Sequence, residues 1–159
     1  MNLEHYEFEQ LGEFDYRFFS NGSKGTFEMH VRFTSTGANS CNLGFGAVDP
    51  TSGWLDDLIE LRNGDSQKIL ATVANISCLF MEVHPSIRIY AAGSTASRTR
   101  LYQMGINRIL PQLTDYKIAG LLVEPDRQGG IWGSYPKWKG EWQEFRKGIS
   151  YDAFLIFKR

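Results

Sequence analysis

The sequence has few of the residues that build a disulfide framework, a zinc site or a membrane span. Its 159 residues include only Cys41 and Cys78, too few for a disulfide framework and not in a CxxC pair. Three scattered histidines lack HxH or HxxxH spacing, so we expect no metal and no other cofactor. No apolar run approaches the roughly 18 residues of a membrane span, and the polar, acidic start lacks signal-peptide order. We expect a cytoplasmic protein with reduced thiols and no membrane partner.

The net charge of −1 conceals an uneven distribution along the chain. Residues 1–79 hold five Lys or Arg and eleven Asp or Glu, whereas residues 80–159 hold twelve and seven. A basic C-terminal half suits contact with phosphate groups, but two opposite halves also suit mutual neutralisation within one fold. The sequence leaves both interpretations open. The net charge of the whole chain is far from the strongly basic value of a dedicated nucleic-acid binder.

The first half of the chain has the pattern of β-strands. Strands are expected over residues 15–19, 26–34 and 41–48, with a fourth over residues 54–61. Apolar and polar side chains alternate along the second of these, which is typical of a strand with one face on the core. Asn-Gly and a further glycine within residues 20–25 predict a hairpin turn.

The second half mixes helical and strand patterns. Apolar side chains at i, i+4, i+7 and i+11 predict a helix over residues 66–83, and His84-Pro85 predicts its end. Further elements are expected as a strand over 87–92, a helix from 93 to about 110, a strand over 116–123, a loop over 124–147 and a strand over 151–157. Strand, helix and strand in succession predict a right-handed crossover between parallel neighbours. The order β-β-β-(β)-α-β-α-β-β predicts a single α+β domain over residues 1–159, with two helices packed on a mostly antiparallel, mixed β-sheet.

The stretch over residues 93–102, here called the 93–102 turn, is the most informative for function. A strand that leads through Gly-Ser-Thr into a helix places free backbone N–H groups and the positive helix end at one point, beside hydroxyl and guanidinium groups. The candidate ligand-binding residues are Gly93, Ser94, Thr95, Ser97, Arg98, Arg100 and Tyr102, with Lys68 from the preceding helix. The alternative is that Ser94 or Thr95 only caps the helix.

Helical geometry separates the two arginines of this turn. At about 100° per residue, Arg98 lies at the edge of the stripe that should be buried, whereas Arg100 lies on the opposite, solvated side. The buried stripe comprises Tyr102, Ile106, Ile109 and Leu113, and the solvated side includes Gln103 and Asn107. A guanidinium at the edge of a core needs a bidentate acceptor. That acceptor is either a ligand phosphate or a carboxylate of the fold, for which Asp65, Asp56 and Asp57 are the candidates.

Other constellations are less specific. Lys68 would join Arg98 on one phosphate if the two helix starts faced each other, and would otherwise be exposed. The aromatic residues of the 124–147 loop (Trp132, Tyr135, Trp138 and Trp142) alternate with cations, which suits either single-stranded nucleic acid or a loop packed down by its tryptophans. The chain lacks both the GxxxxGK[ST] pattern and a cysteine near the turn, so a Walker loop and a thiolate phosphatase are excluded. Whether the chain is an enzyme stays open; for RNA cleavage, Tyr102 or His84 would be the nearest proton carriers.

Several of these segments together resemble a family of small, uncharacterised bacterial proteins. They are Asn63-Gly64-Asp65, residues 68–73, the Gly-Ser-Thr-x-x-Arg-Thr-Arg-Leu-Tyr sequence of the 93–102 turn, and residues 151–156. The resemblance extends from about Tyr16 to Lys158. It implies a fold and a bacterial, cytoplasmic origin, and it implies no reaction.

Two hypotheses for function follow. The first is a small phosphate-recognising module that binds RNA, DNA or a nucleotide at the 93–102 turn; compact proteins of this kind serve in toxin–antitoxin and phage-defence systems. The second is a non-catalytic protein-interaction module, in which the turn is structural, Arg98 pairs with an internal carboxylate, and the aromatic loop binds a protein partner.

Overall fold

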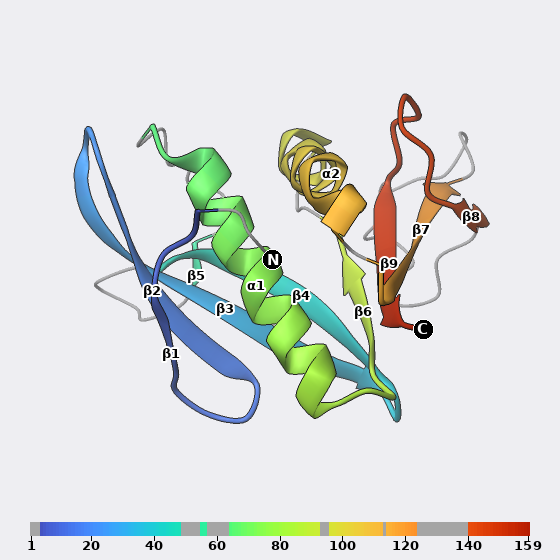
Figure 1. Cartoon of the computed structure of the whole chain (residues 1–159), viewed down its shortest axis with the longest axis horizontal. Helices are drawn as coiled ribbons and strands as arrows, with labels where there is room; N and C mark the ends of the chain where they lie inside the picture. The colour runs from blue at the N-terminus through green and yellow to red at the C-terminus, as the bar shows by residue number, and fades with distance from the viewer. Residues whose placement is uncertain (1–3, 49–54, 57–63, 93–95, 113, 124–139) are drawn as a thin grey trace.

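A computed structural model of the chain describes residues 4–48, 55–56, 64–92, 96–112, 114–123 and 140–159. Within them, two α-helices pack on one face of a mixed, mostly antiparallel sheet, which confirms the predicted α+β class (Figure 1). The helices are α1 (Ser66–Val83) and α2 (Ala96–Ile109), the latter continued by the 3-10 turn η1 (Leu110–Gln112). The strands are β1 (Phe8–Gln10), β2 (Asp15–Gly22), β3 (Gly25–Gly37), β4 (Ser40–Val48), β5 (Leu55–Asp56), β6 (Arg88–Ala91), β7 (Tyr116–Val123), β8 (Gly140–Glu144) and β9 (Ala153–Lys158). Neither described helix is long and apolar enough to cross a bilayer.

The strands follow the order β1-β2-β3-β4-β6-β9-β7-β8, with β5 paired to β4. The first four form an antiparallel meander, and β1, which the sequence did not predict, is its short edge strand. The β2–β3 turn is tighter than predicted, because residues 20–22 still pair with residues 25–27. Gly25 begins β3 at a φ of +110°, a conformation that glycine adopts without steric cost.

Helix α1 has the predicted bounds and buries the predicted stripe. Ile69, Val73, Ile76 and Phe80 lie in the core. The Phe80 ring stacks on that of Phe33 in β3, with ring centroids 4.1 Å apart and planes at 7°. The helix ends at Val83, because His84 precedes Pro85 and a residue before proline avoids the helical conformation. His84 N–H still donates to the Phe80 carbonyl. This helix therefore anchors the N-terminal half of the sheet.

The predicted pairing of the strands around α2 is wrong. Strand β9 lies between β6 and β7 and is antiparallel to both, so Phe154 pairs with Ala91 on one side and with Gly120 on the other. The parallel neighbours are instead β4 and β6, which α1 connects. Strand β9 begins with three buried apolar residues in succession, the pattern of a strand covered on both faces. Such a strand is stable in the interior of the sheet and displaces β7 from the position beside β6.

The predicted loop over residues 124–147 contains a strand. Strand β8 pairs antiparallel with the end of β7, so that Trp142 lies opposite Leu121. Its five residues include only one large apolar side chain, which explains why the strand pattern was missed. Residues 124–139 of the predicted loop lie outside the described part of the chain.

The two helices contact each other through Gly105 of α2. A β-carbon at Gly105 would lie 3.4 Å from the Leu70 side chain of α1, at the near limit of an ordinary van der Waals contact, so the two helices approach each other closely here. A small apolar cavity of about 50 Å³ remains in this seam. Cys78 lines it, and burial raises the pKa of its thiol to about 11, so the thiol is protonated at neutral pH. Cys41 and Cys78 are both free thiols, as predicted.

Candidate functional site

The 93–102 turn follows β6 at the carboxyl edge of the two parallel strands. Figure 1 shows that α1 begins at this same end of the sheet, so the first turns of both helices lie on the side toward which β6 points. Gly93, Ser94 and Thr95 lie outside the described residues. Ser97 and Arg98 belong to the first turn of α2, and their side chains, like those of Asp56 and Asp57, are also outside what the structure describes. The fold thus places both helix starts at the same end of the sheet, near an edge where ligands commonly bind.

Asp65, one of the predicted acceptors for Arg98, already accepts two hydroxyl hydrogen bonds. Its Oδ2 accepts from the Tyr6 hydroxyl at 2.5 Å and from Ser20 Oγ at 2.6 Å, whereas its Oδ1 is buried and has no hydrogen-bond partner. Burial, helped by the hydrogen bond to Asp65, raises the pKa of Tyr6. This carboxylate therefore joins β2 and the N-terminal segment to the start of α1, and no described cation pairs with it.

Lys68 lies one turn into α1 and contacts the same N-terminal segment. Its Nζ lies 3.4 Å from a carboxylate oxygen of Glu4 and 4.3 Å from the centroid of the Tyr6 ring. Lys68 would have to leave Glu4 to share a phosphate with Arg98, and that arrangement stays a prediction.

The side chains of α2 follow the predicted faces in part. Arg100 is exposed, whereas Thr99, Ile106 and Ile109 are buried. Tyr102 packs inward against β4, because its hydroxyl lies 3.4 Å from the Leu43 carbonyl and its ring meets Phe45 edge-on at 5.3 Å. Leu113 lies outside the described residues. Tyr102 therefore positions the helix on the sheet, and Arg100 is the described cation that projects from the first turns of α2.

The prediction that Gln103 and Asn107 are solvated beside Arg100 is wrong. Gln103 donates a hydrogen bond to the Ile149 carbonyl and accepts one from Tyr151 N–H at 3.1 Å. Asn107 is half-buried, and its Oδ1 is a buried atom without a hydrogen-bond partner. The segment before β9 covers this side of the helix, a long-range contact that helical spacing does not reveal.

Neither predicted proton carrier is placed for chemistry at the turn. Tyr102 is held against Leu43, as described above. His84 lies before β6, stacked on Phe14 at 5.7 Å with ring planes at 15°. The four residues of β6 span about 13 Å, so His84, which precedes β6, is well away from the carboxyl end of that strand. Within the described residues, no three His, Cys, Asp or Glu side chains are grouped to hold a metal ion.

A comparison with protein families now adds to this geometry. A family model described as a family of unknown function matches residues 2–159. The chain belongs to the DUF6934 family. No curated protein and no solved structure matches the chain. The match therefore supports the resemblance seen in the sequence as membership of a family of unknown function. A function for this DUF6934 protein has to be argued from its own residues.

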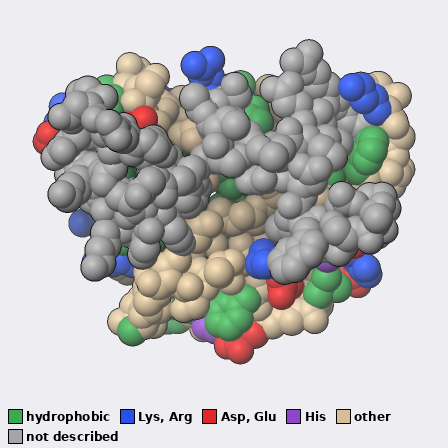
Figure 2. Space-filling view, turned by 180° about the vertical axis from the view of Figure 1, so that it is seen from behind, with side chains coloured by type: hydrophobic (Ala, Val, Ile, Leu, Met, Phe, Trp, Pro, Cys, Tyr) green, Lys and Arg blue, Asp and Glu red, His purple; other side chains and the backbone are tan. Residues whose placement is uncertain are grey.

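The described ion pairs of this DUF6934 chain mostly join residues within the same half of the sequence. In the N-terminal half, Arg17 pairs with Glu9, Arg32 with Asp15, Lys68 with Glu4 and His30 with Glu28; in the C-terminal half, Lys158 pairs with Glu82. Among the described residues, the one pair between the halves is His84 with Glu13, at 3.9 Å. Figure 2 shows the face of the sheet that the helices leave open, where acidic and basic side chains lie next to each other along the lower right. Among the described residues, ion pairs therefore contribute little to neutralisation between the two halves.

Sequence reasoning missed a group of side chains on this open face. Arg88, Phe157 and Lys117 occupy three adjacent strands in one cross-strand row, and Arg159 follows on the same face. The alternation of side chains along residues 116–123 and 153–158 shows which residues share a face of each strand, but the row across the strands forms only because β9 lies between β6 and β7.

Trp142 of the predicted aromatic loop packs with Tyr90 at 5.8 Å and borders Ala92, Leu121 and Ala153, which confirms the packed interpretation for this tryptophan. Trp132, Tyr135 and Trp138 lie outside the described residues.

Proposed function

We propose that this DUF6934 protein binds a phosphate-bearing ligand, a nucleic acid or a nucleotide, at the 93–102 turn. The supporting observation is the position of the turn, directly after β6 and before α2, at the carboxyl edge of parallel neighbours β4 and β6. Ligands bind outside such edges in open sheets, and the first turn of a helix offers N–H groups and a positive dipole end to an anion.

The residues of the turn have distinct roles in this proposal. Gly93 lets the backbone approach the ligand, and Ser94, Thr95 and Ser97 offer hydroxyl donors beside the N–H groups. Arg98 and Arg100 clamp the phosphate as charged donors. Tyr102 contributes by holding α2 on β4, as its contact with Leu43 indicates. Lys68 is an additional cation that joins when it leaves Glu4.

The test is the salt dependence of binding to short single-stranded RNA, DNA and nucleotides, measured by fluorescence anisotropy or calorimetry. Arg100→Ala is expected to weaken binding about fivefold and to lower the slope of log affinity against log salt by about one, because one phosphate contact is lost. Arg108→Ala is the matched control, since Arg108 is exposed in the last turn of the same helix. Equal binding by the two variants would contradict the proposal.

The alternative function is that of a non-catalytic protein-interaction module, and one observation on α2 supports it. Thr99 and Tyr102 both pack inward, as a structural motif would require. In that case Arg98→Ala lowers the melting temperature, and no nucleic acid or nucleotide binds to the wild-type protein at low salt. A toxin–antitoxin or phage-defence role stays a prediction that depends on the first outcome.

A further inference from the structure

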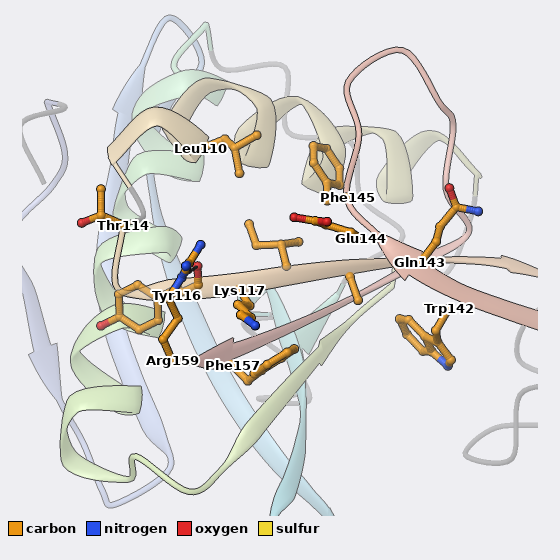
Figure 3. A pocket seen from close by; sticks show the side chains of 12 residues that line it. Leu110, Thr114, Tyr116, Lys117, Trp142, Gln143, Glu144, Phe145, Phe157 and Arg159 are labelled. Carbon is orange, nitrogen blue, oxygen red and sulfur yellow. Dashed lines mark hydrogen bonds between the residues drawn. The ribbon is translucent and has the colours of Figure 1, made fainter.

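A second candidate site lies beside β7, where β8 stops pairing with it. Strand β8 pairs with residues 119–123 of β7, and Phe145 N–H still donates to the Ile118 carbonyl, so residues 116–117 extend past this pairing. A cavity of about 580 Å³ lies at this position, bounded by β7, β8, β9 and the end of α2 (Figure 3). Its volume is within the range of about 300–1,000 Å³ that is typical of small-molecule sites. The start of β7, where Lys117 lines this cavity, is level with the start of β6 and therefore away from the carboxyl end of β6.

Two cations line one end of this cavity, as Figure 3 shows for Lys117 and Arg159. Both side chains are exposed. Arg159 Nε donates to the Tyr116 carbonyl at 3.3 Å, which holds the guanidinium in place while its terminal amino groups stay available. In the described part of the chain, neither cation is in an ion pair with a carboxylate. Two cations without a carboxylate partner among the described residues, one of them held in place, favour an anionic ligand at the mouth of a cavity.

Aromatic rings next to these cations are held by contacts outside the cavity. Phe157 lies directly across from Lys117, and the Arg88 guanidinium lies 4.7 Å from its ring centroid. Arg88 does not line the cavity, so the cavity meets a different part of the Phe157 ring. Tyr116 donates its hydroxyl to Glu82 at 2.7 Å, on the side of α1. Tyr116 is therefore buried toward α1, whereas the partly exposed Phe157 ring is fixed by Arg88 and offers a stacking surface without further loss of side-chain entropy.

The far wall of the cavity, contributed by β8, has a different chemistry. Glu144 and Gln143 line it, and Figure 3 shows them apart from the two cations. A carboxylate accepts hydrogen bonds from exocyclic amino groups of bases, and it repels a second phosphate. The cavity therefore suits one nucleotide unit, with its phosphate at one end and a ring with hydrogen-bond donors at the other.

We propose that this cavity is a nucleotide-binding site. In it, Lys117 and Arg159 bind the phosphate, Phe157 contacts the base, and Glu144 accepts from its amino group. The ligand is a nucleoside phosphate, either free or as one nucleotide of a single strand. This site does not depend on the function proposed for the 93–102 turn, because it uses different residues.

The experiment is titration of the full chain with nucleoside monophosphates, with single-stranded RNA of about eight nucleotides, and with inorganic phosphate, followed by calorimetry and NMR. The double variant Lys117→Ala, Arg159→Ala is expected to lower nucleotide affinity about tenfold, since two charged contacts are lost. Phe157→Leu keeps the apolar volume but not the ring, and is expected to weaken the base-containing ligands and not inorganic phosphate. Lys24→Ala is the control, because it removes one positive charge at the far β2–β3 turn and is expected to bind as the wild type does.

The outcomes separate this site from the 93–102 turn. Binding of the monophosphates identifies a free nucleotide as ligand, and binding of the strand alone identifies single-stranded nucleic acid; each supports the proposal if the double variant is weakened and Arg100→Ala is not. The proposal is overturned if the double variant binds as Lys24→Ala does, or if only Arg100→Ala loses affinity, in which case the turn is the binding site. It is also overturned if inorganic phosphate binds as tightly as the nucleotides.

Discussion

The two halves of the open sheet face differ in whether their described cations are paired with carboxylates. On β1–β4, Arg17 and Arg32 each pair with a carboxylate of a neighbouring strand, and His30 lies 2.7 Å from Glu28. On β6–β9, Arg88 lies over an aromatic ring, while Lys117 and Arg159 border a cavity. A face whose charges are paired internally has little to offer an ion, whereas cations without a carboxylate partner among the described residues are available to one. This difference is the basis for proposing a binding site in the C-terminal half.

The largest expected effect in this comparison concerns two glycines, one from each half of the sheet. In Gly120→Ala of β7, the new β-carbon would lie 2.3 Å from the Tyr151 ring, and that buried ring has little room to move. We expect a loss of about 2 kcal/mol in the free energy of unfolding. Urea denaturation followed by tryptophan fluorescence measures it.

Gly44→Ala in β4 is the matched control. The nearest atom to its new β-carbon is the Arg32 carbonyl oxygen at 3.9 Å, an ordinary contact. The free energy of unfolding should therefore stay within about 0.5 kcal/mol of the wild type or rise slightly, since alanine loses less backbone entropy than glycine. Equal destabilisation by the two variants would show that Tyr151 can move away from β7.

Replacing single cations of the open face is expected to change the free energy of unfolding less than Gly120→Ala does. Arg32→Ala removes an ion pair with a 2.8 Å contact to Asp15, and should lower the free energy of unfolding by about 0.5 kcal/mol. Lys117→Ala removes a cation without a carboxylate partner among the described residues, and should not lower it. Chemical denaturation of both variants, with Asp15→Asn to complete a double-mutant cycle, measures the difference. A larger loss in Lys117→Ala would contradict the assignment of that side chain to ligand binding.

The smallest effect is a pH dependence at Glu82, in the described ion pair of the C-terminal half. A hydrogen bond from Lys158, with a second from Tyr116, lowers the pKa of Glu82. A carboxyl group whose pKa is lowered by folding stabilises the protein above its unfolded pKa, and this stabilisation is lost as the pH falls through the folded pKa. Glu82→Gln should therefore be less stable than the wild type at pH 7, and the difference should disappear between roughly pH 5 and 3. Melting temperatures across that range measure it, and a constant difference would contradict the assignment.

Much of this fold could be predicted from local patterns. Helix α1 was predicted with the observed bounds, because Ile69, Val73 and Phe80 share one helical stripe and Pro85 follows it. The hairpin strands followed from alternation and glycine turns. The position of β9 could not be predicted, because the choice between two strand neighbours depends on contacts between segments more than thirty residues apart. Strand β8 was missed because its sequence lacks a strong alternating pattern.

The candidate site was predictable to a similar extent. Helical spacing correctly placed Arg100 on the exposed side of α2 and Ile106 on the buried side. It failed for Gln103, because the segment before β9 covers that side of the helix. The row formed by Arg88, Phe157 and Lys117 was not visible in the sequence, because it exists only once three strands from distant segments are paired.

The interior position of β9 has a consequence for how the chain reaches its native state. Strands β6 and β7 each hydrogen-bond to β9, which follows both in the sequence, so neither gains its shared neighbour until residues 153–158 have been synthesised. The meander of β1–β4 with α1 consists mainly of contacts between nearby segments and can assemble earlier. During translation, the edges of β6 and β7 are therefore exposed to pairing with other chains until the last strand enters between them.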